Sequence, residues 1–359
     1  MLVFGMALSL NPGDGITKPT LQDIAKQAGV SSSTVSLVLS QKGKISKEVQ
    51  EKVKAAAEDL GYIKGPPIYT GKSNSIAVLF HFDHKLAHTW NILRQVTLKL
   101  QEHLSKQNYI TILIPISYDM SDEEIFRQVI ESRAVAVFSM HFGRERLFSR
   151  LEESSIPVVI IINSQFQDKF HTVCADNFQG SYEAASHLLK LGHRSIVYAE
   201  FDIYQLPATL SDRFLGFYKA INERGLALPP ERKLHLDIND AEDIRKKLEA
   251  VFAGSEAPTA VFFVDDYLAA HSIGILKDMG LSYPDDVSII ASGGVLDYNE
   301  PYVPQITTMN TSPELLGKFS AEMMLNRLEK KPEESYVLKI KQQLIDRGSC
   351  REIPVAGER

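Results

Sequence analysis

Three histidines come closest to the spacing of a metal site. His81, His84 and His88 are separated by three and four residues, which would place them on one face of a helix. The segment follows a short apolar run that predicts a strand, so a loop is expected there and no zinc site is predicted. The sequence lacks the motifs of serine hydrolases, zinc proteases, P-loop proteins and dithiol redox proteins. No catalytic residue and no cofactor is therefore predicted.

A run of hydroxyl side chains, SSSTVS, occupies residues 31–36. Hydroxyl groups can donate or accept hydrogen bonds at base edges and at phosphates. The elements that must position this run are short helices. Thr20 and Asp23 match a capping box for a first helix with apolar residues at 21, 24, 25 and 28. Gly29 ends that helix, and Ser31 caps a second whose apolar face includes Val35 and Val38.

A third helix is predicted after Ser46, with apolar residues at 49, 53, 56, 57 and 60 and lysines on its outer side. The three helices together predict a helix-turn-helix module, which either binds DNA or serves another interaction. The net charge of the chain is −6, but residues 18–72 hold nine Lys and five acidic residues, so this part carries +4 and the remainder −10. This asymmetry favours a nucleic-acid-binding head on an acidic body.

Residues 20–62, TLQDIAKQAGVSSSTVSLVLSQKGKISKEVQEKVKAAAEDLGY, closely resemble the headpiece of the lactose-repressor (LacI/GalR) family. The resemblance implies sequence-specific binding to double-stranded DNA, with Ser32 and Ser33 at base edges and Thr34 and Ser36 at phosphates. The family usually has Arg at the position of Leu37 and Asn at that of Ser40, so an operator unlike the family's common one is expected. The candidate DNA-binding residues are Thr20, Ser31, Ser32, Ser33, Thr34, Ser36, Leu37, Ser40 and Tyr69.

The joint after the headpiece is shorter than is usual in the family, and it contains Pro66-Pro67. Two interpretations stay open for it. One is a plain flexible linker. The other is a single helical turn that inserts Ile68 or Tyr69 into the minor groove and bends the operator.

Beyond residue 75, short apolar runs alternate with helical patterns, which predicts parallel sheets covered on both faces. Strands are expected at 76–80, 110–114, 135–138, 158–162, 195–199, 260–264 and 287–291. Helices are expected at 90–107, 122–132, 178–191, 212–224, 240–254 and 267–279. Because sheets of this kind bind ligands beyond the carboxyl ends of their strands, the segments that follow each strand are the candidate site.

The resemblance extends into the periplasmic-binding-protein-like core of the same family, through DNxxG at 176–180, HLLxLGHR at 187–194, RxxGF at 213–217, PDDVS at 284–288 and RGS at 347–349. It implies an α/β fold: the three-helix headpiece, then two lobes crossed three times by the chain, with an effector between them. The expected domains are a flexible leader 1–17, a DNA-binding domain 18–64, a hinge 65–75 and a core 76–359. Within the core, lobe 1 is expected at about 76–188 and 311–338, and lobe 2 at about 189–308 and 339–351.

In the family, the arginine at position 213 clamps ligand hydroxyls or a carboxylate, a role that suits the planar fork of its guanidinium; the alternative is a solvated arginine near a helix start. Asp176 resembles a ligand-contacting carboxylate or else caps a helix, and Trp90 either packs against the ligand or belongs to the core. The candidate effector-binding residues are His88, Trp90, His141, Asn163, Asp176, Arg213, Asp265 and Ser292.

One departure from the family concerns the ligand class. The family often has G-[YF]-D-D after the strand at 287–291, where an aspartate binds sugar hydroxyls, but this chain has Ser292-Gly293-Gly294-Val295. Loss of such an acceptor is expected to change which ligand is accepted. The predicted effector is therefore a sugar or a sugar-like metabolite, without a closer assignment.

The predicted function is a transcriptional regulator, by the family's default a repressor, acting as a cytoplasmic homodimer on a pseudo-palindromic operator. Two widely spaced cysteines fit a reducing compartment, and no apolar run is long enough to span a membrane. The second hypothesis is an exported solute-binding protein. It would require a secretion signal, whereas the apolar leader has no Lys or Arg before Lys18, and it gives no reason for the basic head.

Overall fold

The computed structural model describes residues 20–39, 45–60, 73–81, 90–117, 119–202, 208–254, 256–293, 296–330 and 334–354. The chain divides into two compact units, Met1–Lys72 and Ser73–Arg359. The predictions made for the leader 1–17 and for Ser40, Ile68, Tyr69 and His88 fall outside the described residues.

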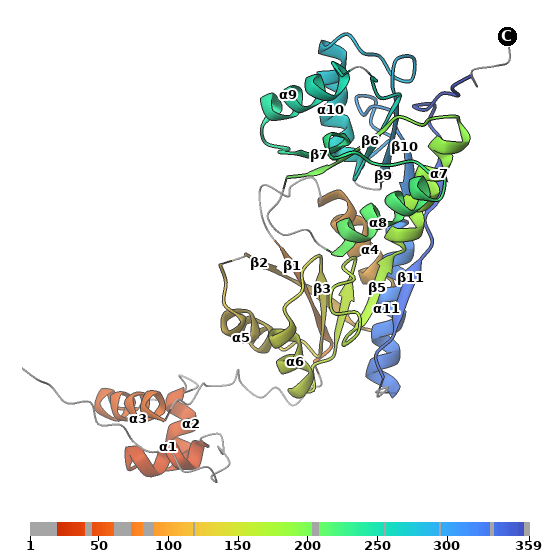
Figure 1. Cartoon of the computed structure of the whole chain (residues 1–359). Helices are drawn as coiled ribbons and strands as arrows, with labels where there is room; N and C mark the ends of the chain where they lie inside the picture. The colour runs from red at the N-terminus through yellow and green to blue at the C-terminus, as the bar shows by residue number, and fades with distance from the viewer. Residues whose placement is uncertain are drawn as a thin grey trace, which may run out of the picture. The chain divides into compact units, whose positions relative to one another are not determined.

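The first unit contains the three expected helices, α1 (Leu21–Ala28), α2 (Ser32–Leu39) and α3 (Lys47–Asp59) (Figure 1). The predicted capping box is confirmed, because Thr20 Oγ1 accepts from the Asp23 amide at 3.3 Å and Asp23 Oδ2 accepts from the Thr20 amide at 2.7 Å. Each helix places one fully buried side chain in a shared core: Ile24, Val35 and Val53. Burial of each contributes about 1.5–3 kcal/mol, which fixes the face of α2 that remains outside.

The second unit contains two six-stranded sheets. The first is entirely parallel, in the order β11-β5-β4-β3-β1-β2. The second, in the order β12-β10-β9-β8-β6-β7, is parallel except for the antiparallel pair β10–β12. The first sheet comprises β1 (Ser75–His81), β2 (Ile110–Ile116), β3 (Ala136–Met140), β4 (Val158–Ile161), β5 (His171–Ala175) and β11 (Val337–Ile340). The second comprises β6 (Ile196–Phe201), β7 (Lys233–Leu236), β8 (Ala260–Phe263), β9 (Ser288–Gly293), β10 (Thr307–Asn310) and β12 (Gln343–Ile345).

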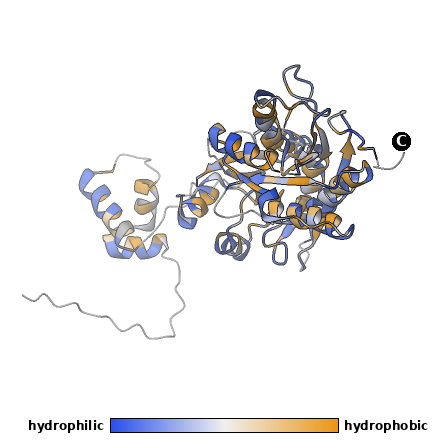
Figure 2. Cartoon of the chain, turned by 45° about the horizontal axis from the view of Figure 1, so that its top comes forward, coloured by the Kyte–Doolittle hydropathy of each residue, from blue (hydrophilic) through white to orange (hydrophobic). Residues whose placement is uncertain are grey.

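Helices cover both faces of each sheet, as the continuous apolar strands require. On β1, Ile76 and Val78 belong to the core under α4 (Trp90–Ser105) and α11 (Pro313–Lys330), whereas Ala77 and Leu79 belong to the core under α5 (Asp122–Ser132) and α6 (Glu145–Glu153). This alternation follows from the two-residue period of a strand. In Figure 2 the helices combine blue and orange residues, as expected for helices with one buried side.

The second sheet carries α7 (Asn177–Lys190), α8 (Ala208–Asn222), α9 (Ala241–Phe252) and α10 (Asp266–Asp278), with a short 3-10 turn at Pro230–Arg232 before β7. The lobe boundary differs here from the prediction, which placed residues up to 188 in lobe 1. The buried residues of α7, among them Ala184 and Leu188, belong to the core of the second lobe, and α7 packs against α8. The first crossing therefore lies at 175–177, directly after β5.

The seven predicted strands and six predicted helices are all present, most within about two residues of the expected ends. The exception is α8, which begins at Ala208 where Asp212 was expected, because the buried Thr209 and Leu210 extend its apolar face by a turn. The sequence patterns did not predict five of the strands or two of the helices. The elements without a prediction are β5, β7, β10, β11, β12, α6 and α11.

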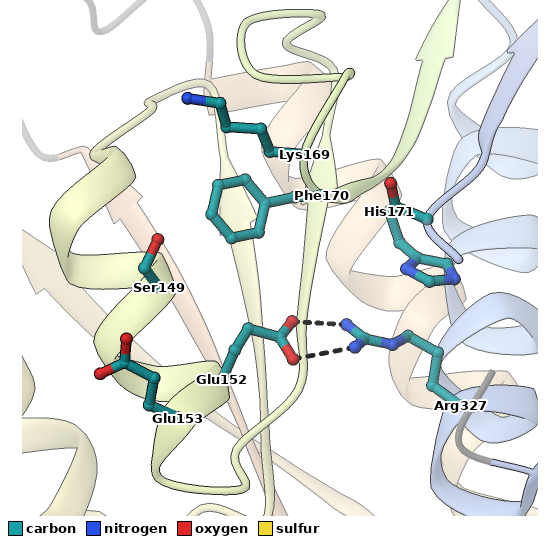
Figure 3. A pocket seen from close by; sticks show the side chains of 8 residues that line it. Ser149, Glu152, Glu153, Lys169, Phe170, His171 and Arg327 are labelled. Atoms are coloured by element: carbon teal, nitrogen blue, oxygen red, sulfur yellow. Dashed lines mark hydrogen bonds and ion pairs between the residues drawn. The ribbon is translucent and has the colours of Figure 1, made fainter. Parts of the chain in front are cut away.

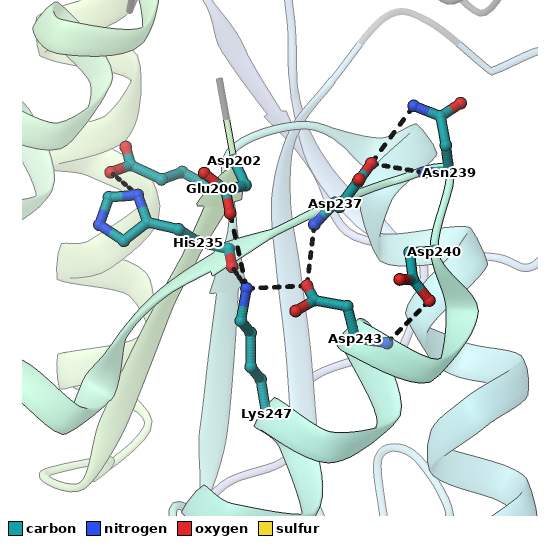
Figure 4. Close-up of polar contacts among 8 residues, drawn as sticks. All are labelled: Glu200, Asp202, His235, Asp237, Asn239, Asp240, Asp243 and Lys247. Atoms are coloured by element: carbon teal, nitrogen blue, oxygen red, sulfur yellow. Dashed lines mark hydrogen bonds and ion pairs between the residues drawn. The ribbon is translucent and has the colours of Figure 1, made fainter. Parts of the chain in front are cut away.

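A buried carboxylate ties the edge strand β7 to its neighbour β6 (Figure 4). Glu200 is fully buried, and its Oε1 lies 2.9 Å from Lys233 Nζ and 3.3 Å from His235 Nδ1. Beyond the carboxyl ends of both strands, Lys247 Nζ lies 2.8 Å from Asp243 Oδ2 and 3.7 Å from Asp202 Oδ2. A lysine ammonium thus already serves as the cation of this acidic cluster, which indicates a structural role.

Gly216 sets the distance between α7 and α8, and with it the position of the arginine one turn earlier. A Cβ at Gly216 would lie 2.0 Å from the carbonyl oxygen of Phe178, whereas a Cβ at the helical Gly274 meets nothing within 4 Å. We expect Gly216→Ala to lower the free energy of unfolding by about 1–3 kcal/mol or more, because the helices must separate. The control Gly274→Ala should be neutral or stabilise by up to about 1 kcal/mol. Urea denaturation of both variants measures this, and equal effects would contradict the packing described.

Candidate DNA interface and effector site

The outer face of α2 consists of small polar side chains and one apolar side chain. Ser32, Ser33 and Ser36 are exposed, and Leu37 is 42% exposed. These residues lie opposite Val35 and Val38, which are buried in the three-helix core. Because an α-helix fits the major groove of DNA, this face has the size and chemistry needed to contact base edges.

The remaining described hydroxyls of the interface serve the helix ends. Ser31 Oγ accepts from the Thr34 amide at 3.1 Å, which confirms Ser31 as the cap of α2, and it lies 2.8 Å from Thr34 Oγ1. Thr20 Oγ1 donates to Asp23 Oδ2 at 2.7 Å. Thr20 and Ser31 therefore position the helices, and any contact that these two and Thr34 make with phosphate stays a prediction, as do the roles of Ser40 and Tyr69.

Arg213 joins segments that follow strands of both sheets. Its Nε donates to Asn177 Oδ1 at 2.9 Å, just beyond β5, and its Nη1 donates to the carbonyl oxygen of Val264 at 2.7 Å, just beyond β8. Its Nη2 donates to no residue in the described part of the chain. The guanidinium is thus held beyond the carboxyl ends of two strands, and its second terminal nitrogen is available to donate to a ligand. The sequence prediction named Arg213 but missed Asn177, whose role depends on a contact 36 residues away.

Burial and opposite charge act on this arginine and on the neighbouring aspartate. Burial raises the pKa of Asp265 to about 6, and its hydrogen bond from Leu268 and the charge of Arg213 limit the rise. Burial lowers the pKa of Arg213, against the opposing charge of Asp265. Asp265 Oδ1 accepts from the Leu268 amide at 2.8 Å and so caps α10. Asp265 therefore has an observed role as a helix cap, and its contact with an effector stays a prediction.

Asp266 and Tyr298 are further polar residues near this aspartate that the sequence prediction did not include. Asp266 is fully buried, and its Oδ2 accepts from the Tyr298 hydroxyl at 3.0 Å. Burial, and then the charge of Asp266, raises the pKa of Tyr298. The guanidinium carbon of Arg347 lies 3.6 Å from the centroid of the Tyr298 ring. The only sequence signal for this arrangement was the acidic pair 265–266 directly after a strand.

The two lobes also touch directly beside Arg213. Ser164 Oγ, beyond β4, lies 3.2 Å from Asp212 Oδ2 on α8. Asn163 is buried beside Ser164, and its amide donates to the carbonyl of His141 at 3.3 Å and accepts from the Gln165 amide at 2.9 Å. Asn163 and His141 therefore order this loop, and their contact with an effector stays a prediction.

Three other candidate residues have described surroundings. Trp90 is 40% exposed at the start of α4, with its ring edge-on to Phe80 at 5.7 Å. Asp176 caps α7 by accepting from the Gln179 amide at 3.2 Å, which confirms one of its two interpretations and leaves the other untested. Ser292 is fully buried with its Oγ 3.3 Å from Ser181 Oγ on α7, so the structure assigns it a packing contact.

A glutamine links two of the three chain crossings at this site. Gln342 lies between β11 and β12, and its Nε2 donates to the carbonyl of Asp176 at 3.4 Å and to Asn177 Oδ1 at 3.5 Å. Gly180 makes room for it, because a Cβ there would lie 2.5 Å from Gln342 Oε1. The oxygen that holds Arg213 therefore also receives a bond from a second crossing segment.

Comparison with known proteins identifies both parts of the chain. The family described as "Bacterial regulatory proteins, lacI family" matches residues 20–64, and the "Periplasmic binding protein-like domain" matches residues 185–350. The chain combines the DNA-binding domain of the LacI family with a periplasmic-binding-protein-like domain. It is therefore a DNA-binding transcriptional regulator rather than an enzyme, as predicted.

Individual relatives agree with this LacI-family assignment over nearly the whole chain. The HTH-type transcriptional repressor PurR of Pectobacterium carotovorum subsp. carotovorum is 28% identical over 342 residues, which is 93% of this chain and 98% of the relative. The transcriptional regulator CelR–cellobiose complex superposes with a TM-score of 0.68 at 21% identity, covering 92% of this chain and 99% of that one. The lac repressor dimer bound to operator and the anti-inducer ONPF gives a TM-score of 0.64 at 19% identity, covering 93% and 100%. These structural similarities confirm the predicted fold.

Within the described residues, no group of three or more His, Cys, Asp or Glu side chains is arranged to hold a metal ion. Among the same residues, no helix combines the length and apolar character needed to cross a bilayer.

The pKa of Asp265 predicts a specific pH dependence of stability. Because its folded pKa of about 6 exceeds the value of ~3.9 for an unfolded aspartate, its stabilising contribution is complete below pH 4 and is lost as the pH rises through 6. Asp265→Asn keeps the cap but cannot ionise. The stability of the variant relative to the wild type should therefore increase by about 2–3 kcal/mol between pH 4 and pH 7. Urea denaturation of the unliganded proteins measures the difference, and a value independent of pH would contradict a buried Asp265.

Proposed function

We propose that this chain is a cytoplasmic homodimeric repressor that binds a pseudo-palindromic operator through α2 and releases or tightens its hold when a sugar or sugar-like metabolite binds beside Arg213. The observation that carries the proposal is the pair of bonds from Arg213 to Asn177 and to the carbonyl of Val264. They hold one charged fork where strands of both sheets end, so a ligand there can sense how the two lobes are arranged.

The DNA side of the proposal rests on the exposed face of α2. Ser32 and Ser33 offer donors and acceptors without strong preference for one base, whereas Leu37 can contact only apolar groups such as the thymine methyl. A two-fold dimer would place two such helices in successive major grooves, about 34–36 Å apart. A lac repressor dimer bound to operator is among the similar structures and supports this arrangement.

The effector side rests on hydrogen-bonding capacity. Arg213 Nη2, and the Asp265 carboxylate in its ionised form, supply a donor and an acceptor suited to hydroxyl groups or to a carboxylate. The related regulator CelR has been solved as a cellobiose complex, which supports a sugar-like ligand. Gly294 and Val295 stand where the family often has two aspartates, so a ligand with fewer hydroxyl contacts after this strand is expected.

Regulation would follow from the contacts between lobes. A ligand shifts the lobe arrangement only by the difference in its affinity for the two arrangements, typically about 1–3 kcal/mol. The Ser164–Asp212 hydrogen bond joins the two lobes, and the Gln342–Asn177 hydrogen bond joins two of the segments that cross between them. They are the contacts that a change in lobe arrangement would alter.

The effector proposal is tested by a thermal-shift screen with sugars, sugar phosphates, uronates and nucleobases. A true effector at 100 times its dissociation constant should stabilise the wild type by ~2.7 kcal/mol. Arg213→Ala should abolish the response to that compound while remaining folded by circular dichroism. A compound that shifts the wild type and Arg213→Ala equally would argue against the proposed site.

The DNA proposal is tested with an operator selected from a random duplex library. The double variant S32A/S33A should weaken operator binding about 10- to 100-fold, because each lost base contact is worth on the order of 1 kcal/mol. Glu51→Ala, an exposed change on α3, should leave affinity unchanged. Fluorescence anisotropy at fixed salt gives both values. Equal affinities for the double variant and the wild type would show that α2 does not read the bases.

A further inference from the structure

A pocket lies in the first lobe at the amino ends of its strands, whereas the candidate effector site lies beyond their carboxyl ends. Its volume is about 380 Å³, within the range of small-molecule sites. It is lined by side chains from α6, from the segment entering β5, and from α11 and the segment that follows it (Figure 3). His171 begins β5, whereas Asn177 and Arg213 meet beyond the other end of that strand. The pocket therefore shares no residue with the site described above.

Both cationic side chains that line the pocket are already paired with carboxylates. Arg327 forms a two-point ion pair with Glu152, with nitrogen–oxygen distances of 2.7 and 2.9 Å, and also donates to the carbonyl of Val158 at 2.8 Å. Lys169 Nζ lies 2.5 Å from Glu145 Oε1. An anionic ligand would have to compete with these carboxylates. The pocket is therefore not built as an anion site.

His171 contributes an unsatisfied polar group to the pocket wall. The residue is 3% exposed, its buried Nε2 has no hydrogen-bond partner, and its Nδ1 forms no hydrogen bond with a described residue. Burial, and then the charge of Arg327, lowers the pKa of His171 to about 4, so the ring is neutral at pH 7. A neutral imidazole offers one nitrogen lone pair as an acceptor. Leaving such a buried group without a partner costs on the order of 1–3 kcal/mol.

Glu153 supplies negative charge at the same place. It is exposed, lines the pocket and forms no ion pair with a described residue. It is also the last residue of α6, where the carbonyl ends of the helix already make the surroundings negative. A carboxylate is unfavourable at that end of a helix and a cation is favourable. The half-buried Ser149 and Ser335 add two hydroxyl oxygens that accept no hydrogen bond from the described residues.

The unused groups of the pocket are thus a carboxylate, an imidazole nitrogen and two hydroxyls, a set rich in acceptors. We propose that this pocket binds a small organic compound bearing a primary ammonium group, with Glu153 as its counter-ion and His171 as a hydrogen-bond acceptor. A primary ammonium has three donors and a positive charge, and so it matches this set. The Phe170 side chain lines the pocket beside these groups and contributes apolar surface for the carbon chain of the ligand.

The place of this pocket in the fold gives it a regulatory consequence. The amino ends of β4 and β5 lie at the same end of the sheet as the amino end of β1, because all strands of this sheet are parallel. Ser75, at that end of β1, follows directly on the segment that connects to the DNA-binding unit. A ligand in the pocket would therefore act on the end of the lobe at which the chain enters from the DNA-binding unit.

The test measures the binding of 1,4-diaminobutane to the full-length protein by isothermal titration calorimetry. Two compounds of similar length serve as chemical controls, the neutral 1,4-butanediol and the dianion butanedioate. We expect measurable binding of the diamine and at least tenfold weaker binding of both controls. No heat from the diamine at about 10 mM, well above a millimolar dissociation constant, would overturn the proposal. Tighter binding of butanedioate would overturn it too, in favour of an anion site.

Two variants in the pocket and two control variants locate the binding. Glu153→Gln should weaken the diamine at least tenfold, while Glu131→Gln, at the equivalent end of α5 and outside the pocket, should leave it unchanged. His171→Phe preserves a ring against Tyr336, 4.7 Å away between centroids, and should weaken the diamine without loss of thermal stability. Arg213→Ala should retain diamine binding. If the diamine bound Glu153→Gln as well as the wild type, or failed to bind Arg213→Ala, the pocket would not be its site.

Discussion

The hydrogen bonds of Arg213 are the interactions on which the sensing part of the molecule depends. One nitrogen reaches the amide oxygen of Asn177 beyond a strand of the first sheet, and another reaches the carbonyl of Val264 beyond a strand of the second. A half-buried guanidinium needs such partners, because an unpaired charge in that position is costly. The close approach of α8 to α7 at Gly216 makes these bonds possible. The residues that fix the start of α7 against α8, where the chain leaves the first sheet, are thus also those that would meet a ligand.

Serine and threonine hydroxyls have different roles in the DNA-binding unit and in the sensing unit. In the head, the hydroxyls of Thr20 and Ser31 cap helix ends beside a small apolar core, and the serines of α2 at 32, 33 and 36 remain on the outside. In the core, hydroxyls such as those of Ser181 and Ser292 are buried against each other under a helix. Residue type alone does not distinguish a contact with DNA from a contact with a helix. The position relative to the buried face does.

Much of this could be predicted from the sequence, because strong local patterns govern it. The capping box at Thr20, the apolar face of α2 and the continuous apolar strands all act over a few residues, and the structure confirms them. The helix α11 escaped prediction because small residues such as Gly317 and Ser320 occupy its buried face against α4 and weaken its periodicity. Strands of three or four residues, such as β7 and β12, have too few positions for any period to show. Arg213 was predicted through family resemblance, whereas its partner Asn177 and the Tyr298–Asp266 pair depend on contacts between distant segments.

The central claim is that ligand binding in the sensing unit and operator binding by α2 are coupled, and thermodynamic reciprocity tests it most directly. Operator affinity would be measured by fluorescence anisotropy with and without saturating effector, and effector affinity by calorimetry with and without saturating operator. The account predicts that both affinities change by the same factor, about 5- to 150-fold. Operator affinity that is unchanged by a bound effector would contradict it.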